Sequence, residues 1–185
     1  MPESSNQNFN HLKIHSQYSI CEGAVKIDNL QDFSKSNKIK ALGLCDTSNL
    51  CGALEFAEKI SKVGTQPIIG TQINFKYGEC SGLLPLFALN EEGYKRIIKL
   101  SSISFLENDE LSDPHIEFNE ILNDNQGVAV FSGTIFGLFG ELFNKGKFSE
   151  VLELYKKLKL NFGDRFYIEI QRHGDQNEVG FEKFN

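Results

Sequence analysis

The stretch His11-Leu-Lys-Ile-His-Ser-Gln-Tyr-Ser19 sets the pattern by which the rest of this chain can be interpreted. A short apolar run ends in a polar cluster, and the same arrangement returns in Leu44-Cys-Asp-Thr-Ser-Asn-Leu50. His, Asp, Ser and Thr are residue types that bind metals or handle phosphate. In α/β proteins, functional groups gather where strands end. The two stretches therefore predict an α/β fold with a polar site beside its strand ends.

The composition is that of an ordinary globular protein. The chain has 185 residues, of which 40% are hydrophobic and 24% charged, which suits one α/β domain or part of a larger one. Its net charge of -6 argues against this segment gripping nucleic acid by itself, because neutralising phosphates needs clustered Lys and Arg. The one basic run, at 156–159, lies near Glu150 and Glu153 and is interpreted as a solvated helix face.

The cysteines and the apolar runs indicate the compartment. No C-x-x-C pair, no signal-peptide pattern and no apolar run long enough to cross a bilayer is present in the sequence. We therefore expect a cytoplasmic protein without a membrane partner, whose thiols act as small hydrophobic side chains. These thiols are Cys21, Cys45, Cys51 and Cys80.

The hydrophobic pattern alternates between strand and helix spacing, which is the signature of βα units. Strands are expected at 12–14, 41–45, 67–75, 83–89, 128–131 and 166–170. Helices are expected from Asp28, at 49–63, from Asn90, at 136–144, at 148–160 and after Asp175. Residues 104–125 form the least regular part, and Pro85 suggests a sheet edge or a bulge.

Local signals add detail to these helices. Asp28 is expected as an N-cap with Gln31 at the N3 position, and Leu30 and Phe33 are expected to face inward. Asn90 is expected to cap the later helix. The apolar stripe of the helix at 49–63 is predicted to consist of Leu50, Ala53, Leu54, Ala57 and Ile60.

Both ends of the chain carry a prediction. Residues 1–10 are polar and patternless, which predicts a loose N-terminal arm ahead of a domain at 11–185. The chain stops at Asn185 inside an apparent helix, and a layered sheet or barrel that ended there would leave a strand edge uncovered. We therefore expect this domain to be an incomplete piece of a longer protein.

Polar residues follow several of the expected strands. His15, Asp46 and Gln72 lie near the ends of the first three, Ser132-Gly-Thr134 follows the strand at 128–131, and His173 follows the strand at 166–170. If these strands are parallel, the groups face one pocket although they are far apart in sequence.

Each of these residues also has a structural interpretation. A single His after a strand is more often a surface or hydrogen-bonded side chain than a ligand. Residues 46–49 can form a helix cap, Gln72 can be a polar strand residue, and 173–175 can be a turn. His115 lies in the irregular region and is given no role.

The order of motifs adds a family resemblance. Residues 11–19 with Gly23-Ala24, and then 41–56, resemble the start of a PHP (polymerase and histidinol phosphatase) domain. The version is similar to that at the N-terminus of bacterial replicative DNA polymerase III alpha chains, and the similarity continues through later motifs. These motifs are Pro67–Ile73, Leu89–Tyr94 with Lys99–Ser102, and Phe166–Gly174.

The resemblance implies a fold and a set of metal-site positions. The fold would be the N-terminal part of a distorted seven-stranded (β/α) barrel, with metal ions held at its mouth. Three of the family's ligand positions would be retained here, and four would be substituted. The retained positions are His15, Asp46 and His173; the substituted ones are Lys13 for His, Thr47 for His, Gln72 for Glu and Thr134 for Cys.

These substitutions predict a site without metal. A cluster of cations needs anionic ligands, which Gln72 and Thr47 do not supply. Lys13 would put an ammonium where a neutral imidazole should donate a lone pair. We therefore expect no catalytic residue and no cofactor in this segment, with Lys13 paired to Asp46.

The resemblance also implies a function for the longer protein. That protein would be a magnesium-dependent DNA-directed DNA polymerase that contacts DNA through downstream domains. This segment would be a scaffold that docks the proofreading exonuclease subunit and other replicase subunits. The alternative is an active metal-dependent phosphoesterase, either a proofreading nuclease or a pyrophosphatase, with His15, Asp46 and His173 as ligands. A free-standing enzyme like histidinol phosphatase is a third possibility, disfavoured by Asn90–Tyr94.

Overall fold

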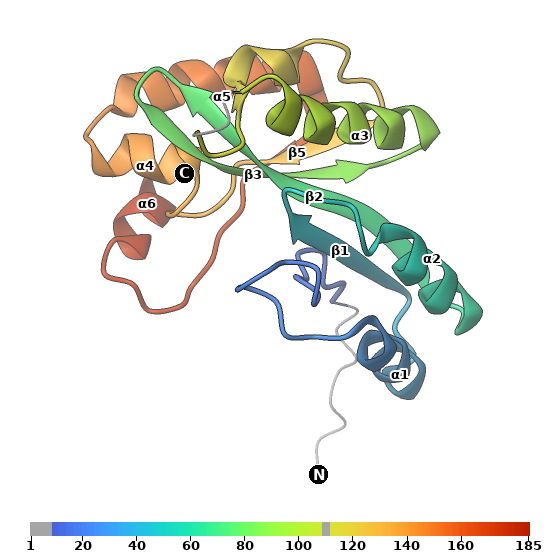
Figure 1. Ribbon diagram of the computed structural model, residues 1–185. Coiled ribbons are helices and arrows are strands. Elements are labelled where there is room, and N and C mark those ends of the chain that lie inside the picture. Colours follow the sequence, from blue (N-terminus) through green and yellow to red (C-terminus); the bar gives the residue numbers. More distant parts are fainter. Residues whose placement is uncertain (1–8, 109–111) are drawn as a thin grey trace.

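The computed structural model describes residues 9–108 and 112–185 (Figure 1). Of the predicted N-terminal arm only residues 9 and 10 are described, and both are exposed; the rest of that prediction lies outside the described residues. The helices are α1 (Ile27–Asn37), α2 (Ala53–Lys62), α3 (Glu91–Leu106), α4 (Leu138–Asn144), α5 (Phe148–Phe162) and α6 (Glu178–Phe184), with 3₁₀ turns at Phe118–Leu122 and Gly163–Arg165. The strands are β1 (Ala41–Thr47), β2 (Gln66–Tyr77), β3 (Cys80–Ala88), β4 (Ile116–Glu117), β5 (Val128–Phe131) and β6 (Phe166–Tyr167).

The strands form one open, mixed sheet in the order β1-β2-β3-β5-β6, with β4 on β2. β1 pairs with β2 in parallel, β3 is antiparallel to both β2 and β5, and β5 pairs with β6 in parallel. Therefore β1, β2, β5 and β6 all point the same way and their carboxyl ends lie on one side. The predicted α/β class is confirmed, and the described part of the sheet is not closed into a barrel.

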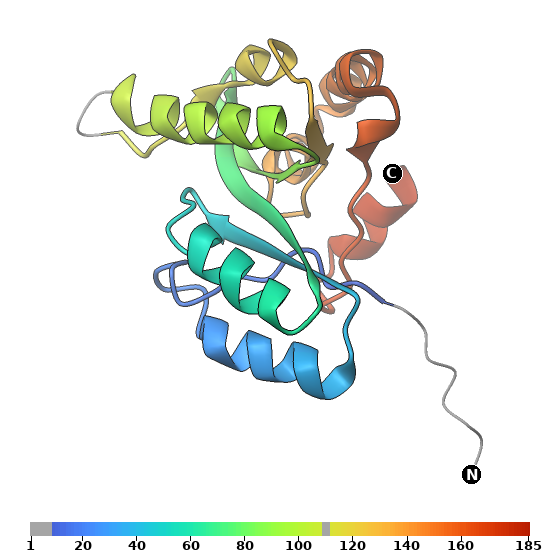
Figure 2. The same ribbon diagram turned by 90° about the vertical axis from the view of Figure 1, so that its right-hand side faces the viewer.

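The core has two larger clusters, towards the two ends of this sheet, and a small third one of Cys45, Phe87 and Ala129. The larger cluster lies where β2, β3 and β5 meet α3, α4 and α5, and includes Phe75, Leu86 and Phe139. The smaller cluster joins β1 to α1 and α2, which lie side by side in Figure 2, and is centred on Leu42 and Phe56. The site described below lies at the strand ends that these two clusters hold in place.

The predicted first strand at 12–14 is wrong, although the segment does lie along β1. The amide of Gly43 donates to the carbonyl of His11 at 2.7 Å, and that of Cys45 donates to Ile14 at 2.8 Å. The two bonds are three residues apart on one segment and two apart on β1, so no regular ladder forms.

The last strand is shorter than the predicted 166–170. Its partner β5 ends at Phe131, after which the hydroxyl of Ser132 accepts a hydrogen bond from the amide of Glu169 at 2.9 Å. A side chain thus replaces the strand partner, and the backbone leaves the sheet before Glu169.

The edge predicted at Pro85 is present only locally, because β3 as a whole lies between β2 and β5. Pro85 pairs with Gln72 on β2, whereas β5 pairs only with Leu86, Phe87 and Ala88. The proline is tolerated because it stands just beyond the residues that pair with β5.

Helix starts were predicted less well than helix positions. α1 begins at Ile27, so Asp28 lies in its first turn, and the Gln31 amide donates to the carbonyl of Lys59 instead of completing a cap. Phe33 is 42% exposed while Ser34 is buried. In α2, the predicted stripe residue Leu54 is 72% exposed, whereas Phe56, which was not predicted, is fully buried together with Ile60.

The predicted N-cap of α3 is confirmed. The side chain of Asn90 accepts a hydrogen bond from the amide of Gly93 at 2.9 Å. Gly93 is required here because an added Cβ would stand 1.8 Å from the carbonyl oxygen of Gly127. This contact fixes the start of α3 against the turn that leads into β5.

Candidate functional site

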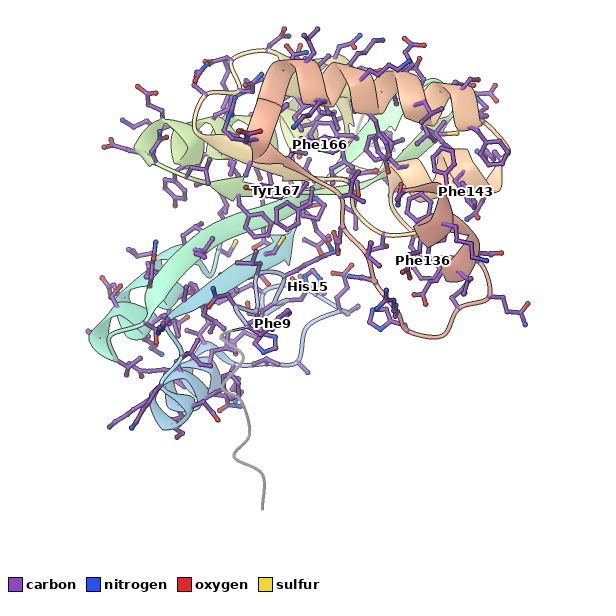
Figure 3. The ribbon with its side chains drawn as sticks, turned by 180° about the vertical axis from the view of Figure 1, so that it is seen from behind. Phe9, His15, Phe136, Phe143, Phe166 and Tyr167 are labelled. Atoms are coloured by element: carbon purple, nitrogen blue, oxygen red, sulfur yellow. The ribbon has the colours of Figure 1, made fainter. Side chains whose placement is uncertain are left out.

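A cavity of about 410 Å³ opens where the parallel strands end. Most of the residues singled out from the sequence contribute to its wall, and Figure 3 shows two contributors, His15 and Phe136, which come from different elements. The lining consists of Lys13, His15, Glu22, Gln72, Leu83, Thr134, Phe136, Gly137, Gln171 and His173. The predicted convergence is therefore confirmed for His15, Gln72, Thr134 and His173, which Lys13 joins, but not for Asp46 or Ser132.

Lys13 is paired with Glu169, so the predicted contact with Asp46 is wrong. Lys13 Nζ lies 3.1 Å from Glu169 Oε1, and the two side chains are only 18% and 11% exposed. Glu169 is held there by the bond from its amide to Ser132. The pair joins the segment before α1 to the segment after β6, because the sheet brings the ends of β1 and β6 to the same side.

Asp46 faces away from the cavity and holds a turn instead. It is 1% exposed. Its Oδ1 accepts hydrogen bonds from the Ser16 amide at 2.6 Å and the Ser19 hydroxyl at 2.7 Å, and its Oδ2 accepts one from the Ser16 hydroxyl at 2.8 Å. Both carboxylate oxygens are therefore bonded to the turn at 16–19.

Thr47 and Gln72 bond to each other. The β1–β2 pairing puts them opposite one another, and Gln72 Nε2 donates to Thr47 Oγ1 at 2.8 Å. The Thr47 hydroxyl in turn donates to a carboxylate oxygen of Glu22. Sequence reasoning gave Glu22 no role, and nothing in the local pattern distinguishes it from a loop residue.

The two histidines of the cavity differ in their surroundings. His15 Nδ1 is buried and has no hydrogen-bond partner among the described residues. His173 is exposed, and its Nε2 lies 3.2 Å from Gln171 Oε1. Thr134 Oγ1 accepts a bond from the Phe136 amide at 3.1 Å, which shapes the loop between β5 and α4.

Glu178 is a second residue that sequence reasoning missed. Its Oε2 accepts the backbone amides of His173, Gly174 and Asp175 at 2.8, 2.9 and 3.2 Å. Gly174 has a φ of +91°, which suits this tight turn. A carboxylate held by three successive amides fixes the loop that carries His173.

The side chains at this cavity do not fit a cluster of metal ions. The ammonium group of Lys13 is already paired with the carboxylate of Glu169. Both carboxylate oxygens of Asp46 accept hydrogen bonds from serine residues. Within residues 9–108 and 112–185, no group of three or more His, Cys, Asp or Glu side chains is placed to hold a metal ion. No hydrolytic step through such ions can be derived from this arrangement.

The thiols show two environments. Cys45 and Cys80 are buried and Cys21 and Cys51 exposed, so the expectation of hydrophobic thiols fits only the first two. Burial raises the pKa of the Cys45 thiol well above its ordinary value, an effect that nearby Lys13 partly opposes.

None of the described helices combines the length and apolar character needed to cross a membrane.

The comparisons with known proteins agree with these motifs. The PHP domain model matches residues 11–173. Proteins named DNA polymerase III subunit alpha are 36% identical over 191 residues in Caulobacter vibrioides, covering 98% of this chain, and 37% identical over 166 residues in Rickettsia felis, covering 89%. The chain spans only 17% and 14% of the length of these two relatives.

A solved structure was also matched. A protein from Bifidobacterium adolescentis, named for a metal-dependent phosphoesterase activity, aligns over 92% of this chain and 61% of its own, with 12% identity and a TM-score of 0.42. We draw nothing about the site from a likeness at that level. The family match across residues 11–173 and relatives of this identity establish that the chain belongs to the PHP domain family and is homologous to part of DNA polymerase III subunit alpha.

Proposed function

We propose that this segment is a metal-depleted, non-catalytic scaffold within a DNA polymerase of the DNA polymerase III alpha type. The observation that carries the proposal is the 3.1 Å contact between Lys13 and Glu169. By the family resemblance, position 13 would carry a metal-binding histidine. A lysine there supplies a fixed positive charge instead. The carboxylate of Glu169 is paired with this charge and is therefore not free to bind a metal ion.

The role of the longer protein is part of this proposal. Relatives that bear the polymerase name are about six to seven times as long as the segment they share with this chain, which is 14–17% of their length. Template-directed DNA synthesis, its magnesium ions and its contacts with DNA would therefore depend on regions beyond this segment. The net charge of -6 agrees with a segment that does not hold DNA itself.

Docking of a proofreading exonuclease subunit is the role we propose for the scaffold. This proposal rests on the family resemblance, in which polymerases with a degenerate PHP site are expected to dock a separate proofreading subunit on this domain. Other replicase subunits are expected to bind the same longer protein, which we expect to act in the cytoplasm.

One observation favours an active phosphoesterase instead. His15 and His173 line one cavity, and both were candidates for retained ligands. The third candidate, Asp46, does not line it and is bonded to Ser16 and Ser19. Two histidines without a free carboxylate are a weak set for generating hydroxide at closely spaced cations, so this alternative is second.

Metal content tests the proposal directly. The protein is incubated with zinc and manganese, desalted and analysed by plasma mass spectrometry, beside a Lys13→His, Thr47→His, Gln72→Glu variant. We expect wild type to be empty and the variant to bind metal. Lys95→His, at a side chain 70% exposed, is the matched control and should stay empty. Near-stoichiometric metal in wild type would overturn metal depletion and call for nuclease and pyrophosphatase assays.

Docking needs a separate experiment. The longer polymerase and its purified exonuclease subunit are mixed and analysed by size-exclusion chromatography, with and without residues 1–185. Co-elution that requires these residues is expected. Co-elution without them would reject docking on this segment and leave metal depletion intact.

A further inference from the structure

A second, much smaller cavity lies beside the first, between the segment after β6 and α6. Its volume is about 10 Å³, close to the space that one water molecule needs. Oxygen-bearing side chains and three apolar ones form its wall. The lining residues are Thr134, Ile135, Glu169, Ile170, Gln171, Glu178, Phe181, Glu182 and Asn185.

Two carboxylates in this wall each have one oxygen without a partner. Glu178 is 6% exposed, and while its Oε2 accepts three amides, its Oε1 is buried and bonded to none of the described residues. Glu169 bonds Lys13 and Gln171 through Oε1, and its Oε2 is likewise buried and unbonded. A buried acceptor without a donor is costly, because it has given up its hydrogen bonds to water without a replacement.

We propose that the small cavity binds one water molecule, which donates one hydrogen bond to Glu169 Oε2 and the other to Glu178 Oε1. Thr134 lines the same cavity, and its hydroxyl, which accepts from the Phe136 amide, has a proton left to donate to this water. The site thus offers a water up to three partners, which is the usual number for a buried one.

Charge balance favours water over a metal ion. Glu169 is neutralised by Lys13, Glu182 by Arg172, and Glu178 by three amide dipoles. A divalent cation would add charge that no carboxylate here is free to match. It would also need about six oxygens or its own waters, for which a cavity of about 10 Å³ has no room.

The water would complete a continuous hydrogen-bond network beside the larger cavity. The network runs from Lys13 through Glu169 and the water to Glu178, and on to the amides of 173–175. It ties the beginning of the domain to the loop that carries His173. In this protein, charged side chains and one water molecule stabilise the walls of the cavity in place of metal ions.

A crystal structure of the protein at about 1.5 Å resolution tests the proposal. We expect a peak within about 2.6–3.2 Å of both Glu169 Oε2 and Glu178 Oε1. A peak at about 2.0–2.5 Å from these oxygens would identify a cation and overturn the assignment. Direct contact between the two carboxyl groups, or an empty cavity, would overturn it as well.

Two variants make the test specific. Glu178→Met has a side chain of similar length but gives the water no acceptor, so the peak should disappear; the three amides of 173–175 lose their acceptor as well. Glu182→Gln is the matched control, because Glu182 lines the same cavity but both of its oxygens are bonded to Arg172. The peak should persist there. Loss of the peak in both variants, or in neither, would contradict the proposed bridge.

Discussion

Lys13 and Glu169 lie 156 positions apart in the chain and form an ion pair of 3.1 Å beside the cavity at the strand ends, which Lys13 lines. Their side chains are 18% and 11% exposed, so both charges are largely removed from water. The pair links the segment alongside β1 to the segment that leaves β6. It is a contact between the two ends of an open sheet, and its loss should therefore destabilise both ends.

Replacing Lys13 by Met should destabilise the protein by about 2–3 kcal/mol, because Glu169 keeps its charge and loses its cation. Adding Glu169→Gln should recover part of the loss. Lys95→Met is the matched control, since the Lys95–Glu91 pair is exposed and should contribute less than about 0.5 kcal/mol. Urea unfolding measures all of these variants. Equal effects at positions 13 and 95 would show that the buried pair has no special weight.

Asp46→Asn should cost about 2 kcal/mol without any metal being involved. The carboxylate accepts three hydrogen bonds from Ser16 and Ser19, and in Asn the remaining carbonyl oxygen can accept only at its own position, because the NH₂ that replaces the other oxygen cannot accept. Asp164→Asn serves as control because that side chain is fully exposed. Stability is compared by urea unfolding with and without EDTA, and the cost should be the same in both. A cost that appears only without EDTA would instead identify Asp46 as a metal ligand.

The pattern of the sequence was sufficient for most of the elements and for most of the residues that converge at the site. Val128–Phe131 is an uninterrupted apolar run and was predicted with its observed bounds, and Asn90 was recognised as a cap from its residue type. The residues after the strands met in one cavity because β1, β2, β5 and β6 point the same way. Direction of strands is thus enough to gather residues that are distant in sequence.

Partners within the site were beyond the reach of the sequence. Lys13 was expected to pair with Asp46, the nearest acidic residue in the predicted site, but the turn at 16–19 occupies that carboxylate. Glu169 and Glu178 have no local signal of their role. Their partners are set by where β6 leaves the sheet and by how α6 packs, which are tertiary features.

The cluster of Tyr18, Glu55 and Lys59 should make stability depend on acid pH. Bonds from Lys59 at 2.7 Å and from Tyr18 at 2.8 Å hold the pKa of Glu55 below its ordinary value, with the Lys59 bond as the larger cause. The unfolded chain therefore binds more protons in this range, and stability should fall as pH drops from about 5 through the ordinary value of about 4.3.

Glu55→Gln removes the titrating group, so its stability should depend less on pH between about 5 and 3 than that of wild type. Lys59→Met removes the main cause of the lowered pKa and should reduce the difference. Urea unfolding at a series of pH values measures both variants. Parallel curves for wild type and Glu55→Gln would mean that the cluster does not couple to folding.

Phe181 should control both α6 and the loop that carries His173. It is 4% exposed, and its ring centroid lies 5.3 Å from that of Phe143. Because α6 has only 7 residues, it depends on such packing. Phe181→Ala should therefore cost about 3–5 kcal/mol locally. Because Glu178 is on the same helix, its hold on the amides of 173–175 should be lost together with the helix.

Amide hydrogen exchange distinguishes this coupling from a general loss of stability. In Phe181→Ala, the amides of 173–175 should exchange much faster while those of β2 and β3 keep most of their protection. Val179→Ala is the matched control on the same helix, at a side chain that is 60% exposed, and should leave both regions unchanged. If the loop amides stay protected without α6 packing, then Glu178 does not depend on the helix to hold them, and the loop is fixed by its own turn.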